Sequence, residues 1–391
     1  MGLSLLILFF GAIGHAVLWT MLVNRVHAFG IDRRWIDLAT MLCAVAMVAI
    51  AAVIAIVLFM TSAASGLEWA RNAAWFYLAG CTLVCVFTAV QRIRFAYHPE
   101  RCGVLKNHTK RVDLERETET PLAAPGVAGW LSRLPGNQVF EVYVQEKHLE
   151  VPRLAPNHAG LRIAHISDFH MSGRITKAYF ERIADHVNRC EPDLIAITGD
   201  LVEHNRCLDW IPDTFGRLRA PGGVYYVLGN HDRHVDESLL HERLAESGLV
   251  YLGGKWRQVT IRGTPTVLAG NELPWYTPAA NLHDCPPHEA AGLPLRILLA
   301  HSPDQFAWAQ ENDIDLMLAG HNHGGQICLP WLGPIVAPSK HGVRYAAGTF
   351  RAGNTVMHVS RGTACLTPVR YNCPAEIAIL KLSGAVTGFG N

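Results

Sequence analysis

Residues that commonly bind metal ions recur in the C-terminal half of this 391-residue sequence, each time just after a short apolar run. They comprise two aspartates, one asparagine and four histidines: Asp168, His170, Asp200, Asn230, His301, His321 and His323. Carboxylate and imidazole together suit borderline divalent ions such as Zn, Mn or Fe, whereas an oxygen-only set would suit Mg or Ca. Two ions about 3.5–4 Å apart lower the pKa of a shared water and clamp the attacking and leaving oxygens of a phosphate ester. The number and type of donors therefore indicate a two-metal site for phosphate-ester hydrolysis.

The apolar runs that precede these residues must hold them in place. They are short and rich in β-branched residues, which is typical of buried strands, and they cover residues 162–167, 194–198, 224–228, 297–300 and 316–319. Open α/β sheets place their ligand sites at the carboxyl ends of strands, so we expect these side chains along one edge of a sheet. Asp200 is the expected bridge between two ions, because it lies on an inner strand and a carboxylate has two oxygens.

In their order along the chain, the blocks D-x-H, G-D, G-N-H-[DE], H and G-H-x-H resemble the calcineurin-like metallophosphoesterase superfamily over about residues 160–382. The resemblance implies an α/β fold in which two sheets form a sandwich flanked by helices. It also implies two groups of ligands that share Asp200 as a bridge: Asp168, His170 and His323 for one ion, and Asn230, His301 and His321 for the other.

Two residues beside these ligands are candidates for proton transfer. The resemblance implies that His231 protonates the leaving-group oxygen or stabilises the transition state. Glu203 stands where some relatives have a carboxylate that orients this histidine, in keeping with the usual pairing of a catalytic base with an orienting group. The alternative for Glu203 is a solvated loop residue.

A narrower resemblance comes from residues 320–326, 360–362 and 368–377. These segments are similar to a membrane-associated bacterial branch that includes general phosphodiesterases and a UDP-diacylglucosamine hydrolase. Arg361 and Arg370 lie within them and are candidate contacts for substrate phosphate, although an exposed arginine is usually only solvated.

The N-terminal third contains three apolar runs, residues 3–23, 38–60 and 73–90. Each is close to the roughly 20 residues that cross a bilayer, so we predict three transmembrane helices. The segments after the first and third runs are the most basic, and the positive-inside rule places both in the cytoplasm. We therefore expect a membrane anchor at 1–95, a juxtamembrane linker at 96–137, and a phosphoesterase domain at 138–391 on the cytoplasmic face of the inner (plasma) membrane.

Composition narrows the possible partners. The formal net charge of +1 gives no reason to expect nucleic-acid binding. The ten cysteines show no spacing typical of disulfides or zinc sites, which is consistent with reduced thiols in a cytoplasmic domain. Residues 139–151 alternate apolar and polar side chains, as an edge strand of the catalytic sheet would.

The apolar stretch 327–336 follows the last histidines and contains Trp331. One interpretation is an ordinary packed loop. The other is a lip that receives acyl chains or dips into the membrane interface, a position that suits tryptophan. The second interpretation predicts a lipid-linked phosphodiester or pyrophosphate, such as a UDP-acylated sugar, as the substrate. The alternatives are a general phosphodiesterase acting on soluble substrates and a catalytically silent metal-binding interaction module.

Overall fold

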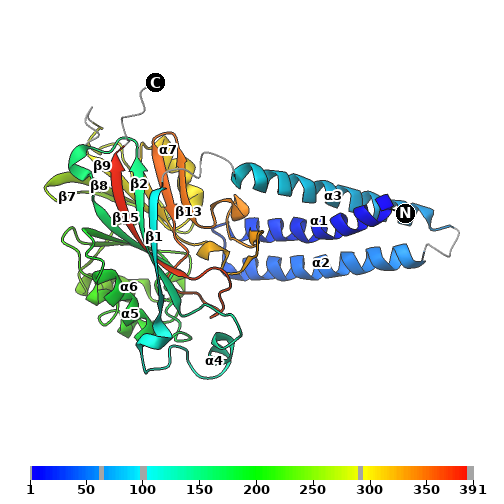
Figure 1. Ribbon diagram of the computed structural model, residues 1–391, viewed down its shortest axis with the longest axis horizontal. Helices are drawn as coiled ribbons and strands as arrows, with labels where there is room; N and C mark the ends of the chain where they lie inside the picture. The colour runs from blue at the N-terminus through cyan, green and yellow to red at the C-terminus, as the bar shows by residue number, and fades with distance from the viewer. Residues whose placement is uncertain (1, 61–65, 97–103, 289–293, 385–391) are drawn as a thin grey trace. The chain divides into compact units, whose positions relative to one another are not determined.

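The computed structural model describes residues 2–60, 66–96, 104–288 and 294–384. The chain divides into two compact units (Figure 1). The first comprises residues 1–98 together with 338–344, and the second comprises residues 99–337 and 345–391.

The first unit contains three long apolar helices, α1 (Gly2–Val26), α2 (Arg33–Met60) and α3 (Glu68–Ala96), which run side by side in Figure 1. In the described part of the chain, these three are long and apolar enough to cross a membrane. Two glycines let α1 approach α3 closely. A Cβ atom at Gly14 would lie 1.7 Å from the carbonyl oxygen of Cys81, so no larger residue fits there.

A buried histidine joins all three helices of this unit. His15 on α1 faces Tyr77 of α3, with 2.7 Å between Nδ1 and the phenolic oxygen. Its Nε2 lies 2.9 Å from the carbonyl oxygen of Met47 on α2. With the proton on Nε2, the ring donates to Met47 and accepts from Tyr77, so both ring nitrogens are satisfied where water would be absent.

The second unit is built around two sheets. The first sheet has seven strands, in the spatial order β1 (Val104–Asp113), β2 (Glu141–Val151), β15 (Ala375–Gly384), β3 (Arg162–Ile166), β4 (Leu194–Thr198), β5 (Val224–Val227) and β6 (Leu249–Tyr251). Strands β3 to β6 are parallel, as expected for strand–helix alternation. Helices α5 (Lys177–Asn188) and α6 (Glu237–Glu246) connect strands of this sheet.

The second sheet has six strands, in the order β13 (Gly348–Ala352), β14 (Thr355–Val359), β10 (Leu316–Ala319), β9 (Leu295–Ala300), β8 (Thr264–Asn271) and β7 (Trp256–Ile261). Its four inner strands, β14, β10, β9 and β8, are parallel, and both edge strands are antiparallel. Two short helices, α4 (Val127–Ser132) and α7 (Phe306–Glu311), and a hairpin of β11 (Cys328–Leu329) and β12 (Gly333–Pro334) complete the unit.

Apolar side chains fill two layers of this unit. One cluster combines residues from both sheets, among them Ile163, Leu268 and Leu318, and is therefore the core of a sandwich. The other cluster combines the first sheet with helices α5 and α6. The α/β sandwich flanked by helices that the sequence predicts is thus confirmed.

The segment expected to be a juxtamembrane linker contributes a strand to the first sheet. Strand β1 pairs antiparallel with β2 along its length. Strand β2 is therefore not the edge strand that its alternating pattern predicted, because β1 covers it. Most β1 side chains are exposed on both faces, so the strand lacks the apolar alternation by which strands are recognised in sequence.

Candidate metal centre

The predicted ligands come from five strands in two sheets. Asp168, Asp200 and Asn230 lie just beyond the carboxyl ends of β3, β4 and β5 in the first sheet. His301 and His321 follow β9 and β10 in the second sheet. The fold thus brings the ends of both parallel strand sets to one place, and the five blocks of the sequence meet there.

One group of donors combines Asp168, His170, Asp200 and His323, whose ligand atoms all lie within 4.8 Å of one another. The Nε2 atoms of His170 and His323 face each other at 2.9 Å. An Asp168 oxygen is 3.6 Å from Nε2 of His323, and an Asp200 oxygen is 3.5 Å from Nε2 of His170. These separations are those of donors that converge on a common point.

A second group combines Asp200, His301 and His321 within the same distance limit. Nε2 of His301 lies 3.2 Å from Oδ2 of Asp200 and 3.2 Å from Oδ1 of Asn230. The same Asp200 oxygen therefore faces His170 in the first group and His301 in the second. This shared carboxylate is the geometry that a bridge between two ions requires.

Five of the seven candidate ligands have a left-handed backbone. Their φ angles are +54° at Asp168, +46° at His170, +55° at Asp200, +71° at His321 and +48° at His323. Each such residue costs about 1–3 kcal/mol and persists only where its surroundings fix it, which is typical of functional sites. Backbone hydrogen bonds supply that constraint, as when the Asp168 and His170 amides donate to the carbonyls of Gly199 and Asp200.

Glycines allow the loops to close around these donors. A Cβ atom at Gly229 would lie 2.2 Å from an Asp200 oxygen, and one at Gly362 would lie 2.9 Å from Cβ of Asp168. Any other residue at either position would displace a candidate ligand. Gly362, in the segment 360–362 singled out in the sequence, therefore packs directly on the candidate metal centre.

Three candidate ligand histidines use Nδ1 to contact the protein and leave Nε2 for the centre. Nδ1 of His170 faces Glu203 at 2.5 Å, Nδ1 of His301 faces the Thr198 carbonyl at 2.7 Å, and that of His323 faces the Ala364 carbonyl at 3.2 Å. Such contacts orient metal-bound imidazoles and set their tautomer. The donor set therefore fits a pair of divalent ions in identity, convergence and orientation.

Burial and charge set the ionisation of this cluster. Burial opposes the charged form of His301, but the neighbouring Asp200 carboxylate outweighs it and raises the pKa of His301 to about 9. Burial likewise opposes the Asp200 carboxylate, yet His301 and His231 hold its pKa well below the usual range. Two cations would take the place of such protons, because a histidine ligand must be neutral.

Glu203 is enclosed rather than solvated, with 4% of its surface exposed. One oxygen, Oε1, lies 2.5 Å from Nδ1 of His170 and 2.6 Å from Nδ1 of His231. Burial raises the pKa of Glu203, but these hydrogen bonds outweigh it and hold the pKa far below its usual range. A single carboxylate therefore orients both a candidate ligand and the candidate acid.

Two residues of the site were not predicted from the sequence. The buried Asp232 carboxylate accepts hydrogen bonds from the amides of Gly229, Asp200, Leu201 and Val202, and so ties the β4 and β5 loops together. Its position as the last residue of the G-N-H-[DE] block could have identified it in the sequence. Trp275 packs against His301 and His321 at ring distances of 5.4 and 4.7 Å, and no motif marks it.

The remaining predicted site residues have different surroundings. Arg361 is half-buried next to Gly362. Arg370 is fully buried and donates to the carbonyls of Cys373, Arg361 and Ala364, so its guanidinium is engaged by the protein. Its guanidinium supports the loop, since the Ala364 carbonyl that it contacts also faces Nδ1 of His323. Trp331 is fully exposed in the β11–β12 hairpin.

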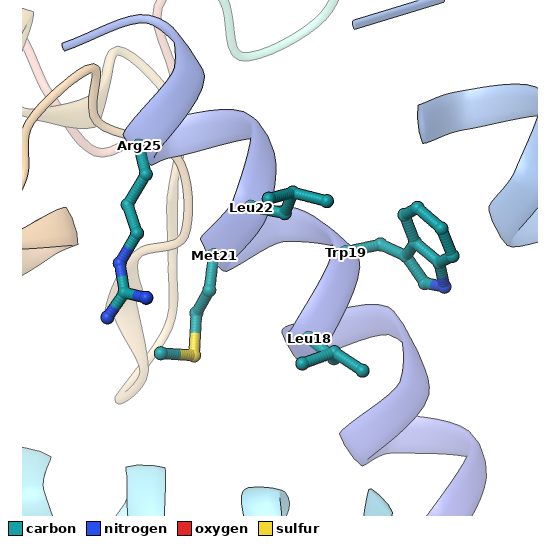
Figure 2. Close-up of a pocket in the computed structure, with 5 residues that line it drawn as sticks. All are labelled: Leu18, Trp19, Met21, Leu22 and Arg25. Atoms are coloured by element: carbon teal, nitrogen blue, oxygen red, sulfur yellow. The ribbon is translucent and has the colours of Figure 1, made fainter. Parts of the chain in front are cut away.

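A surface pocket of about 250 Å³ lies elsewhere, in the helical unit (Figure 2). Its lining comes from α1 alone: Leu18, Trp19, Met21, Leu22 and Arg25. None of these is a candidate ligand. We therefore assign the chemistry to the buried donor cluster instead.

Comparison with known proteins agrees with this geometry. Residues 161–325 match the family model described as calcineurin-like phosphoesterase. The chain is 32% identical to the phosphodiesterase YaeI of Escherichia coli over 58% of this chain and 83% of that protein. It is 29% identical to the uncharacterised metallophosphoesterase YkuE of Bacillus subtilis over 57% of this chain and 79% of that protein. It is also 24% identical to the UDP-2,3-diacylglucosamine pyrophosphatase LpxG of Chlamydia trachomatis over 69% of this chain and 97% of that protein.

Proposed function

This chain belongs to the calcineurin-like metallophosphoesterase family, and we propose that it is a membrane-anchored enzyme that hydrolyses a phosphodiester or pyrophosphate bond with two divalent ions. The observation that carries the proposal is the shared position of Asp200 in two converging donor groups. All seven donors are in place, which argues against a catalytically silent module.

The first ion would be held by Asp168, His170 and His323, the second by Asn230, His301 and His321, with Asp200 as the bridge. When bound, a pair of dications supplies an activated water and neutralises charge on the phosphate. Mn, Zn or Fe suits this mixture of imidazole and carboxylate. The role of the chain is to hold the donors rigidly, because phosphoryl transfer depends mainly on positioning and charge stabilisation.

His231 is the proposed general acid. Its Nδ1 is engaged by Glu203 at 2.6 Å, which orients the ring, and Nε2 is the atom proposed to give a proton to the leaving-group oxygen. Its side chain keeps 18% exposure, compared with full burial of His301, and a substrate oxygen can therefore reach it. Its backbone amide donates to Asp200, which fixes the acid relative to the proposed bridge.

Arg361 is the remaining candidate for a phosphate contact. Its backbone is fixed on both sides, because its amide donates to Glu376 at 3.0 Å and its carbonyl accepts from Arg370 at 3.0 Å. Its half-buried side chain extends from the turn that packs on Asp168 and His323. A guanidinium there would neutralise a phosphate oxygen that the two ions leave uncompensated.

The exposed hairpin after His323 supports a lipid-linked substrate. Trp331 lies between β11 and β12, with Leu329, Leu332 and Val336 exposed beside it. Contiguous exposed apolar side chains mark an interaction surface, and tryptophan suits a membrane interface. The similarity to LpxG, whose name specifies a diacylated substrate, agrees with this reading. The similarity to YaeI, named a phosphodiesterase, supports the alternative of a general phosphodiesterase.

The three apolar helices would anchor the enzyme in the inner membrane. The connection between α1 and α2 and the segment after α3 carry the basic residues, so we place both on the cytoplasmic side together with the second unit. Confinement to the membrane surface has an evident use when the substrate is itself confined to the bilayer.

The substrate proposal is tested by comparing specificity constants for a lipid phosphodiester in mixed micelles and for its deacylated headgroup. We expect the lipid to be preferred, and Trp331→Ala to lower the specificity constant for the lipid about ten- to hundredfold, because burying a large apolar side chain contributes about 1.5–3 kcal/mol. The headgroup should be unaffected. Trp130→Ala, at an exposed tryptophan on α4, is the matched control. Equal constants for both substrates, unchanged in Trp331→Ala, would leave a general phosphodiesterase.

A further inference from the structure

Two cysteines that are distant in the sequence meet beside the turn that carries His323. The thiol of Cys373 donates to the carbonyl of His323 at 3.3 Å, and the thiol of Cys328 donates to the carbonyl of Gly324 at 3.3 Å. The two acceptors are consecutive carbonyls, so the two sulfurs are neighbours.

The backbones that carry these cysteines are tied together. The amide of Cys328 donates to the Tyr371 carbonyl at 2.9 Å, and the Asn372 side chain donates to the Cys328 carbonyl at 2.9 Å. Chains paired in this way run about 4.8 Å apart, and a disulfide spans Cα separations of about 4.4–6.8 Å. The two segments are therefore held at a separation that a disulfide can span.

The two thiols differ in access to solvent. Cys328 is partly exposed in the β11–β12 hairpin, next to the exposed Leu329. Cys373 is buried, with 2% of its surface exposed. A small oxidant would therefore reach Cys328 first, and Cys373 would be the resolving thiol.

We propose that Cys328 and Cys373 form a redox pair that closes to a disulfide in the presence of a peroxide. The Cys328 thiol loses its proton and its sulfur attacks one peroxide oxygen, giving a sulfenic acid and one water from hydrogen peroxide. The Cys373 sulfur then attacks the sulfenic sulfur and displaces its hydroxyl, which leaves as a second water with the Cys373 proton. Two thiols are oxidised to one disulfide and one peroxide is reduced to two waters.

Closure of this bond would alter the metal centre. Both thiols would lose the hydrogen that now contacts the carbonyls of His323 and Gly324. The turn has no room to absorb a shift of sulfur, since a Cβ atom at Gly324 would lie 2.6 Å from Sγ of Cys373. Movement of the sulfurs would therefore displace the backbone of this turn and, with it, the proposed ligand His323. Oxidation should then slow hydrolysis. This consequence rests on the proposed function, whereas the bond itself does not.

The bond is tested on the full-length protein in detergent, loaded with redox-inert zinc. After hydrogen peroxide and blocking of free thiols, peptide mass spectrometry should find residues 328 and 373 in one linked peptide pair that a thiol reductant separates. Cys328→Ser should abolish this link, and Cys285→Ser, at a buried cysteine of the same unit, should not. Oxidation of Cys328 to a sulfinic acid while Cys373 stays free would overturn the proposal.

Activity is measured on the same samples with a phosphodiester. We expect peroxide to lower turnover about tenfold, as displaced ligand contacts do, and reductant to restore it. The Cys328→Ser protein should not respond, because serine keeps a donor to Gly324 but cannot form the bond. A linked pair with unchanged turnover would refute the control of activity. Loss of hydrolysis in reduced and oxidised protein alike would count against the proposed function, while the mass measurement still decides the bond.

Discussion

One carboxylate oxygen serves two imidazoles at this metal centre. Oε1 of Glu203 faces Nδ1 of both His170 and His231, so the candidate ligand and the candidate acid share an orienting group. A third imidazole lies nearby, since Nδ1 of His234 is 3.9 Å from the second Glu203 oxygen. The orientation of the proposed acid therefore depends on a residue outside the proposed set of seven ligands.

Replacing this carboxylate should separate its two effects. In Glu203→Gln the amide offers one acceptor in place of two charged oxygens, so both imidazoles lose a charge-assisted partner. We expect turnover to fall ten- to hundredfold and metal affinity to weaken, as for other groups that orient ligands. Phosphodiesterase kinetics and metal titration measure the two effects. The control Glu242→Gln, at an exposed position on α6, should change neither turnover nor metal affinity. Wild-type turnover in Glu203→Gln would show that orientation by Glu203 does not contribute to catalysis.

For single residues, the candidate ligands could be predicted from the sequence, but several of the contacts around them could not. The spacing within each block places the donors after strand ends, and strand ends meet at a sheet edge, so their convergence was predictable. The burial of Arg370 was not predictable, because burial depends on tertiary packing and nothing local distinguishes a solvated arginine from one that donates to three carbonyls. The meeting of Cys328 with Cys373 was hidden for the same reason, since their contact joins distant segments.

A series of contacts between buried polar side chains connects the two sheets. His165 on β3 contacts Oγ1 of Thr198 on β4 at 2.9 Å and His358 on β14 at 2.7 Å. His358 in turn contacts Nζ of Lys147 at 2.8 Å, and Lys147 pairs with Glu376. Because Glu376 also accepts from the Arg361 amide, the series links the sandwich interior to the turn beside the metal centre.

One of the two buried histidines in this group, His165, predicts sensitivity to acid. Burial lowers the pKa of His165 to about 3, against about 6.5 when unfolded. Above pH 6.5 the residue is neutral in both states and its contribution to stability is complete. Below that, the unfolded chain takes up a proton that the folded chain refuses, so stability falls as pH drops towards 3. Between pH 6.5 and pH 4.5 the free energy of unfolding should fall by about 2–3 kcal/mol, because each pH unit in this range contributes about 1.36 kcal/mol.

Urea unfolding of the full-length protein in detergent, at pH 7.5 and pH 4.5, measures this loss. His165→Asn should show a shallower fall between the two pH values than the wild type. His283→Asn, at a histidine with 89% side-chain exposure, should retain the full fall. An identical fall in all three proteins would mean that His165 is not the group responsible.

Among the elements, the strands that precede the candidate ligands could be predicted from the sequence, because each is a short apolar run followed by polar residues. Strand β1 could not be predicted, because an edge strand with both faces in solvent needs no apolar side chains. It is recognised only by its pairing with β2, which is a long-range contact. The two-sheet arrangement itself came from the family resemblance, since short apolar runs alone do not say which strands share a sheet.

In the molecule as a whole, two units of different composition are joined in one chain. The N-terminal unit has apolar helices held by glycine contacts and by His15, whereas the second unit buries its charges in a sandwich. Length and hydropathy were sufficient to predict the three helices, since a bilayer demands about 20 apolar residues. Anchoring of the second unit by these helices stays a prediction from hydropathy, and its position on the cytoplasmic face stays a prediction from charge.

The central claim is that hydrolysis depends on two ions bridged by Asp200, and one preparation can test it directly. Metal content and hydrolysis of a chromogenic phosphodiester are measured before chelation, after it, and after a divalent transition metal is restored. We predict about two ions per chain, loss of activity with the metal, and recovery of both. Asp200→Asn should lose metal and activity together, whereas His231→Ala should keep the metal but turn over roughly 10²–10⁴ times more slowly. Full activity in the metal-free protein would contradict the account.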